Sequence, residues 1–154
     1  MSEIQEIRAR LDELRQLYLR ATPAQRYKIA LDRLTNATSD VNLLVQQVGA
    51  VEGFARSVAI DLEHRRGLTP DDAYPSLRFS NAVQLLSDHV APGLSRTTED
   101  LFGPDDWALF TLAVEVRNFL VHEASSLRAG YCRSLKAACQ RVLNKLAEVA
   151  GVSP

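Results

Sequence analysis

Apolar residues recur every three or four positions along most of this chain, and no segment alternates with a period of two. The first spacing is that of a helix with one buried stripe, whereas a half-buried strand would alternate. The pattern therefore predicts an all-α fold, a bundle of about six helices. With 154 residues, the chain has the size of a single domain that can bury a core without disulfides or a structural metal.

Helix start and stop signals divide this pattern into segments. Residues 69–76, which include two prolines, are predicted to form a loop. The predicted helices cover residues 2–21, 23–34, 40–66, 77–90, a segment that starts at Pro104 and includes 107–121, and 130–150.

Two glycines, Gly49 and Gly53, lie inside the longest predicted helix. Glycine within a helix is less favourable than alanine by about 1 kcal/mol. A packing reason would explain their presence, so we expect another helix or a second subunit to approach the backbone closely there.

The two cysteines, Cys132 and Cys139, lie seven positions apart in one predicted helix. This spacing is about 10.5 Å along the axis, too far for a disulfide, and we expect both thiols to be small core residues. The chain shows no leader peptide and no apolar run of transmembrane length, which predicts a cytoplasmic protein without membrane contact.

The charge of the whole chain excludes strong general attraction to nucleic acid or anionic membranes, because 18 basic residues face 19 acidic ones. Any RNA binding must therefore be local. The ends of the chain are basic and the middle is acidic, which is typical of solvated helix faces that attract each other across a bundle. Alternatively, the last helix carries a strip that faces phosphate, with Arg128 and Arg133 as candidate contacts. The strip comprises Arg128, Arg133, Lys136, Arg141 and Lys145.

The segment 107–121 is apolar on nearly every side, so we expect it at the centre of the bundle. Its few polar residues are informative, because unpaired polar groups in a core are strongly unfavourable. On a helix, all of them except Arg117 share one narrow face. These polar residues are Thr111, Glu115, Arg117, Asn118 and His122.

Two interpretations of Arg117 and His122 stay open on spacing alone. Five positions place them about 140° apart on a straight helix, so they converge only if the helix ends or bends near His122. In one interpretation they form a site for an anion. In the other, Arg117 pairs with Glu115 or with a carboxylate of another helix, and the helix dipole favours His122. Glu52, on the longest helix, faces either solvent or this region.

The segment ends in Arg117-Asn118-Phe119-Leu120-Val121-His122. This run resembles the Arg-x(4 to 6)-His motif, in its Arg-Asn-x-x-x-His form, of the HEPN (higher eukaryotes and prokaryotes nucleotide-binding) superfamily. Its place on a late apolar helix, followed by one more helix, is similar to the arrangement in that superfamily. The resemblance implies a HEPN-like bundle over residues 37–154. Residues 1–36 lie outside it and are predicted to form an N-terminal helical hairpin extension.

The resemblance implies a metal-independent endoribonuclease without a cofactor, usually a homodimer in which motif residues of two subunits form one cleft. Arg117 would contact the scissile phosphate, and His122 would be the general acid or base for attack by the ribose 2′-hydroxyl. Asn118 would hold the hydrogen bonds of the cleft or touch the substrate, with Glu115 in a supporting role. These residue types suit the chemistry, since imidazole titrates near neutrality and guanidinium is a permanent planar cation.

The resemblance further implies a toxin or defence component with a cognate antitoxin or regulatory protein as partner. Other superfamily members act as scaffolds, so the alternative is a non-catalytic HEPN-like module for protein interaction or regulation. In a third possibility, residues 2–36 drive assembly as a coiled-coil-like hairpin. No metal site is predicted, because the histidines, His64, His89 and His122, form no His-x-x-x-His or Glu-x-x-His pair.

Overall fold

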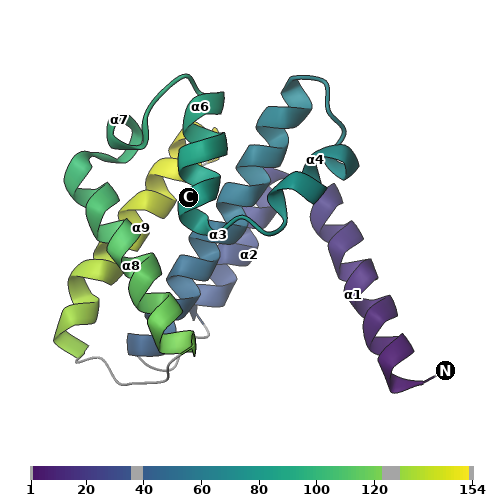
Figure 1. Ribbon diagram of the computed structural model, residues 1–154, viewed down its shortest axis with the longest axis horizontal. Coiled ribbons are helices and arrows are strands. Elements are labelled where there is room, and N and C mark those ends of the chain that lie inside the picture. Colours follow the sequence, from purple (N-terminus) through teal and green to yellow (C-terminus); the bar gives the residue numbers. More distant parts are fainter. Residues whose placement is uncertain (1, 36–39, 123–128, 153–154) are drawn as a thin grey trace.

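The computed structural model describes residues 2–35, 40–122 and 129–152, and this part of the chain is helical with no β-strand (Figure 1). The predicted all-α bundle is confirmed. Residues 82–93 form one continuous helix with a π-helical turn in its middle. The elements are α1 (Glu3–Arg20), α2 (Pro23–Thr35), α3 (Asp40–Arg65), α4 (Pro70–Leu77), α5 (Ala82–Gln84), η1 (Leu85–Val90), α6 (Ala91–Gly93), α7 (Thr98–Phe102), α8 (Pro104–His122) and α9 (Ala129–Val149).

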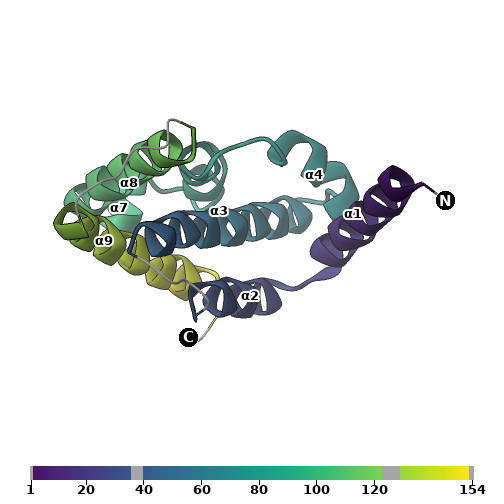
Figure 2. The same ribbon diagram turned by 90° about the horizontal axis from the view of Figure 1, so that it is seen from below.

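The long helix α3 is the centre of the bundle. It packs against α2 and α9, and also against α4, η1 and α8 (Figure 2). Its inward face is mostly apolar, with Gln47 and Ser57 as buried polar residues, and the rings of Phe54 on α3 and Tyr27 on α2 lie 5.3 Å apart. The buried residues of α3 include Leu44, Val48, Val51, Phe54, Ala55 and Val58. At 26 residues, α3 is long enough to contact elements from both halves of the chain.

The expectation that segment 107–121 lies at the centre is wrong. The helix that carries it, α8, lies at the side of the bundle and packs mainly against α9, with fewer contacts to α3. It buries Phe110, Ala113 and Val114, but Leu112 and Phe119 are 47% and 43% exposed. A helix that is apolar on nearly every side can be central, or it can present an apolar face to a partner, and periodicity does not separate these cases.

The predicted loop at residues 69–76 is also wrong, because these residues form α4. The Thr69 side chain caps this helix by accepting a hydrogen bond from the backbone N–H of Asp72 at 3.2 Å, and Pro70 occupies the first helical position. These are the preferred residues for a helix start. They outweigh the helix-breaking effect of Pro75 one turn later.

The next helix starts at Ala82 rather than at the predicted Leu77. Asn81 and Gln84 form a capping box there: each side chain accepts a hydrogen bond from the other residue's backbone N–H, at 2.9 and 3.0 Å. This box fixes the end of the turn between α4 and α5. A further short helix, α7, was not predicted.

The remaining helix boundaries agree with the predictions. The ends of α1, α2 and α9 lie within one residue of the expected positions. Gly67 follows α3 with φ of +103°, a left-handed conformation that favours glycine. At Gly53, by contrast, an added Cβ would meet nothing within 4 Å, so the space beside this residue does not itself require glycine.

The two helices of the predicted N-terminal extension are placed differently. Helix α2 packs along α3, and its Tyr27 and Ala30 belong to the buried core. Helix α1 projects away from the body of the molecule (Figure 1). No helix in the described ranges is both long enough and apolar enough to cross a membrane.

Cys132 and Cys139 are free and buried, as predicted. Burial raises the pKa of the Cys139 thiol from 9.0 to about 12, because the thiolate is poorly solvated in the core. In the folded protein this thiol therefore stays protonated at pH values where the unfolded chain ionises.

This difference predicts a loss of stability in alkaline solution. Below pH 9 the contribution of Cys139 is fully present, and it declines as pH rises from about 9 towards 12, because the unfolded state alone loses the proton. Urea unfolding at pH 8 and pH 10 measures the change. The decline should be smaller in a Cys139→Ala variant, and equal declines in the two proteins would contradict the prediction.

Candidate functional site

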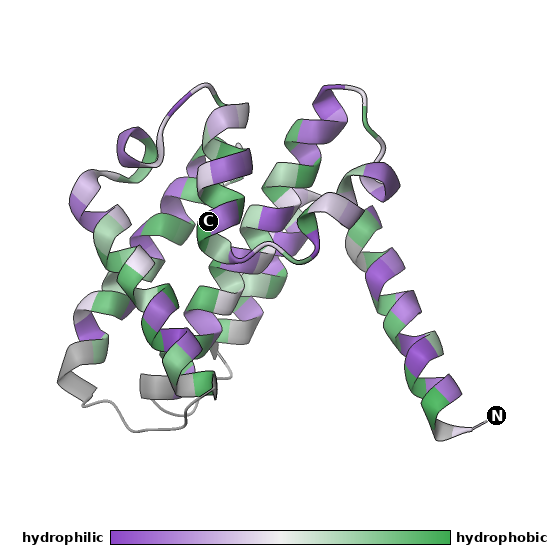
Figure 3. Ribbon diagram, viewed as in Figure 1, coloured by the Kyte–Doolittle hydropathy of each residue, from purple (hydrophilic) through white to green (hydrophobic). Residues whose placement is uncertain are grey.

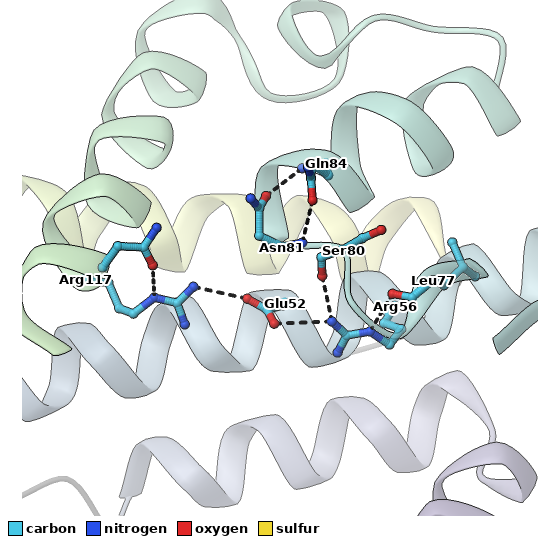
Figure 4. A network of polar contacts seen from close by, with 8 residues as sticks. Glu52, Arg56, Leu77, Ser80, Asn81, Gln84 and Arg117 are labelled. Atoms are coloured by element: carbon cyan, nitrogen blue, oxygen red, sulfur yellow. Dashed lines mark hydrogen bonds and ion pairs between the residues drawn. The ribbon is translucent and has the colours of Figure 1, made fainter. Parts of the chain in front are cut away.

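Arg117, near the end of α8, makes two polar contacts within the described part of the chain (Figure 4). Its Nε donates a hydrogen bond to Oδ1 of Asn118 at 3.0 Å, and its Nη2 donates to Oε2 of Glu52 on α3 at 3.2 Å. The Arg117 side chain is only 19% exposed. The first two motif residues are therefore in direct contact, and a carboxylate from another helix holds the guanidinium.

Glu52 is shared between two arginines. Its second oxygen, Oε1, accepts from Nη2 of Arg56 one helical turn along α3, at 3.2 Å. Arg56 also donates to the backbone carbonyls of Leu77 at 3.2 Å and Ser80 at 2.8 Å. This Arg117–Glu52–Arg56 network links α8, α3 and the turn between α4 and α5 (Figure 4).

The local sequence explains the half of the network that lies on α3. Glu52 and Arg56 are four positions apart, so they lie on the same helix face. Leu77 ends α4, and its carbonyl accepts from the backbone N–H of Ser80 at 3.2 Å, which leaves a second lone pair to accept from a side chain. Arg56 donates to the carbonyl of Leu77 and also to the carbonyl of Ser80, and so connects the end of α4 to α3.

The network carries two guanidinium groups and one carboxylate, and so an excess of positive charge. All three side chains are mostly buried, where a charge interaction is stronger than at a fully exposed surface. The two contacts of Arg117 use two of the five N–H donors of its guanidinium. Within the described part of the chain, the other donors of this group are left for a ligand.

Of the polar residues predicted to share one face of α8, the structure describes the side chains of Thr111, Glu115 and Asn118. Thr111 donates to the carbonyl of Trp107 at 2.9 Å, a contact within the helix. Glu115 and Asn118 are exposed. The carboxylate that pairs with Arg117 in the described structure belongs to Glu52 rather than to Glu115. The predicted pairing with another helix is thus observed, and Glu115 has no such role.

The other candidate residues are placed as follows. His122 is the last residue of α8, and its side chain lies outside the described part of the structure. Arg128 also lies outside the described residues, and Arg133 is exposed on α9.

Two members of the basic strip on α9 are paired with carboxylates. Arg141 binds Asp106, at the start of α8, through three contacts of 2.8 to 2.9 Å, and these hydrogen bonds raise the pKa of its guanidinium. Lys145 binds Glu148 at 2.9 Å. The Arg141–Asp106 pair joins two helices and favours the interpretation of the strip as a solvated face that attracts acidic residues across the bundle, whereas the Lys145–Glu148 pair lies within α9.

Arg56 is the site residue that the sequence did not single out, and Glu52 was left open between solvent and this region. Their spacing of four is a visible signal, but it is common on exposed helix faces. Their proximity to Arg117, 65 positions after Glu52, depends on how α8 packs on α3. Local sequence carries no signal for that contact.

Comparison of this chain with protein-family models, curated proteins and solved structures found no match. The HEPN resemblance therefore rests on the motif and on its place in the bundle. Among the residues that the structure describes, no group of three or more His, Cys, Asp or Glu side chains could hold a metal ion.

Proposed function

We propose that this protein is a metal-independent, HEPN-type endoribonuclease that cleaves RNA through the ribose 2′-hydroxyl, with Arg117, Asn118 and His122 as catalytic residues. The observation that carries the proposal is the fixed position of Arg117. Asn118 and Glu52 hold its guanidinium at the end of α8, and donors remain for a phosphate group. A planar cation fixed in advance is well suited to the charge that grows on a phosphate in the transition state.

Asn118 supports this role through the orientation of its amide. Its Oδ1 accepts the hydrogen bond from Arg117, so its NH₂ group points elsewhere and can donate to the substrate. Both residues can then donate to the same anion. Because the Arg117–Glu52–Arg56 network keeps an excess of positive charge, phosphate is attracted to it despite the carboxylate.

His122 supplies the group that moves protons in this proposal. The 2′-oxygen attacks phosphorus, its proton passes to a base, and the 5′-oxygen leaves with a proton from an acid. The products are a 2′,3′-cyclic phosphate and a 5′-hydroxyl. An imidazole can serve either step near neutral pH. The second imidazole would come from His122 of a second copy of the chain, bound through the exposed apolar residues Leu112 and Phe119 on the same helix.

An exposed aromatic residue next to the network also suits RNA. Phe79 is 84% exposed and directly precedes Ser80, whose carbonyl binds Arg56. The guanidinium carbon of Arg78 lies 4.5 Å from the centre of the Phe79 ring. Unpaired RNA bases stack on such aromatic and guanidinium surfaces.

The test is cleavage of a labelled single-stranded RNA by the purified full chain in the presence of EDTA. We expect fragments that end in 2′,3′-cyclic phosphate. A DNA oligonucleotide of the same sequence and a 2′-O-methyl RNA should stay intact, because both lack the nucleophile. Sedimentation should show a dimer that Leu112→Asp weakens. Cleavage that depends on an added divalent metal, or cleavage of DNA, would contradict the proposal.

A second candidate function is a non-catalytic module for protein interaction or regulation. Two observations favour it. Glu52 pairs with the guanidinium of Arg117 in the absence of any ligand, and α1 and α8 carry exposed apolar residues. In that case RNA would stay intact in every preparation.

A cytoplasmic toxin or defence role, with a cognate antitoxin or regulatory protein as partner, accompanies the nuclease proposal. Co-expression with such a partner would relieve toxicity in cells.

A further inference from the structure

Helix α1 carries an apolar stripe that the rest of the described chain leaves uncovered. Its Ile4, Ile7, Leu11 and Leu14 are between 44% and 67% exposed. The helix projects from the body, and its principal contacts are with α4 (Figure 2). Figure 3 shows hydrophobic and hydrophilic residues alternating along the projecting helix. The stripe therefore faces solvent in the isolated chain.

The spacing of the stripe is that of a coiled-coil seam. The four residues follow one another at steps of three, four and three positions, which are the a and d positions of a heptad repeat. The 18 residues of α1 span about 27 Å, and a helix of this length without packing partners is only marginally stable in water. A second helix laid along the seam would cover the apolar residues and stabilise α1.

The residues that flank the seam are mostly basic. Arg8 and Arg15 lie on one side of it and Arg10 on the other, with Glu3 as the one acidic residue at a flanking position. The remaining acidic residues of α1 lie away from the seam. Arg10 and Arg15 contact acidic residues of their own helix, at 2.6 and 3.6 Å. The side chain of Arg10 is 63% exposed and that of Arg15 is 37% exposed, and ion pairs at the surface are weak.

This charge pattern argues against a second copy of α1 as the occupant. In a parallel pair, Glu3 would face Arg8, but Arg10 would face Arg15. In an antiparallel pair, Arg8 and Arg15 of the two copies would face one another. Like charges at these positions destabilise a coiled coil, and opposite charges select the partner.

We propose that α1 is a docking helix for a partner protein, which contributes an amphipathic helix with apolar seam residues and acidic residues at the flanking positions. Such a helix covers Ile4, Ile7, Leu11 and Leu14 and places its carboxylates beside Arg8, Arg10 and Arg15. The proposal does not depend on RNA cleavage, because the network at Arg117 lies on other helices.

Two labelled synthetic peptides test this proposal against the full chain by fluorescence anisotropy. Both contain three heptads with Ile at a and Leu at d, and they differ only in carrying Glu or Lys at the flanking e and g positions. We expect the acidic peptide to bind at least about tenfold more tightly than the basic one and to weaken in about 0.5 M salt. An Arg8→Glu, Arg10→Glu, Arg15→Glu variant should reverse the preference.

A double variant Ile7→Asp, Leu11→Asp should lose the acidic peptide while keeping the circular dichroism and thermal midpoint of the body, because both residues are exposed. Leu68→Asp, at an exposed apolar residue beyond the end of α3, is the matched control and should bind the peptide normally. Equal binding of the two peptides would overturn the proposal. A dimer that only the α1 variant dissociates would also overturn it, because the occupant would then be a second copy of the chain. Binding of α1 to phosphatidylserine vesicles in place of the peptide would overturn it as well.

Discussion

Replacing Arg117 or His122 with alanine should lower the rate of RNA cleavage by about 10² to 10⁴-fold, because each change removes a group that stabilises charge or transfers a proton in the transition state. The protein should stay folded in the Arg117→Ala variant, since Glu52 keeps its contact with Arg56. Cleavage rates under single-turnover conditions, together with thermal unfolding, measure both effects. Arg66→Ala, an exposed arginine beyond the end of α3, is the matched control and should cleave normally.

Two further measurements separate catalysis from a structural role. Arg117→Lys keeps the charge but loses the planar fork, so we expect it to restore RNA binding and little of the rate. The dependence of the cleavage rate on pH should differ between the wild type and His122→Ala, because the variant lacks the group that transfers protons. If the wild type cleaves RNA and Arg117→Ala does so equally well, the assignment of the site is wrong. If all proteins are inert, the interaction module is the better description.

Replacing Glu52 with alanine should have the second largest effect, and it should act on stability and catalysis together. The variant leaves two mostly buried guanidinium groups without their carboxylate, which we expect to destabilise the fold by about 1 to 3 kcal/mol. It also frees Arg117 to move, and misplacement of a positioning group by about 1 Å can reduce a rate by about 10²-fold. We therefore expect the cleavage rate at saturating RNA to fall by about 10 to 10²-fold.

RNA should bind more tightly to the Glu52→Ala variant, although this variant cleaves it more slowly. Removal of Glu52 takes away a negative charge beside the phosphate site, so KM should fall while kcat falls too. Glu52→Gln keeps a hydrogen-bond acceptor and should recover part of the rate. Glu63→Ala, which breaks a weak pair with Arg66 just beyond the end of α3, should change neither quantity. A Glu52→Ala protein with unchanged kcat would show that the carboxylate does not position Arg117.

The helices that could be predicted from the sequence are those whose signals are local. Apolar spacing, Pro23 at a helix start and Gly67 at a helix end identify α1, α2, α9 and the end of α3. Two of the differences from the predictions have separate causes. Two prolines suggested a loop at residues 69–76, but the Thr69 cap and Pro70 start a helix. The apolar segment of α8 was placed at the centre because composition does not reveal which of its sides stays uncovered.

The residues of the candidate site also divide into those that the local sequence identifies and those that it does not. Arg117 and Asn118 are found from the motif, since neighbouring residues at a helix end can be recognised locally. Glu52 could not be assigned to solvent or to the site, because its contact with Arg117 is formed only when α8 packs on α3. The position of the His122 side chain, the second copy of the chain and the RNA substrate stay predictions.

Sharing one carboxylate between two cations couples two distant parts of the molecule. An anion that draws Arg117 towards itself weakens its hold on Glu52, and the carboxylate is then left to Arg56. Arg56 also donates hydrogen bonds to the carbonyls of Leu77 and Ser80. Binding of an anion at the end of α8 would thus strengthen the contact between Arg56 and the α4–α5 turn. Slower amide hydrogen exchange in that turn, measured on addition of the anion, would show this coupling.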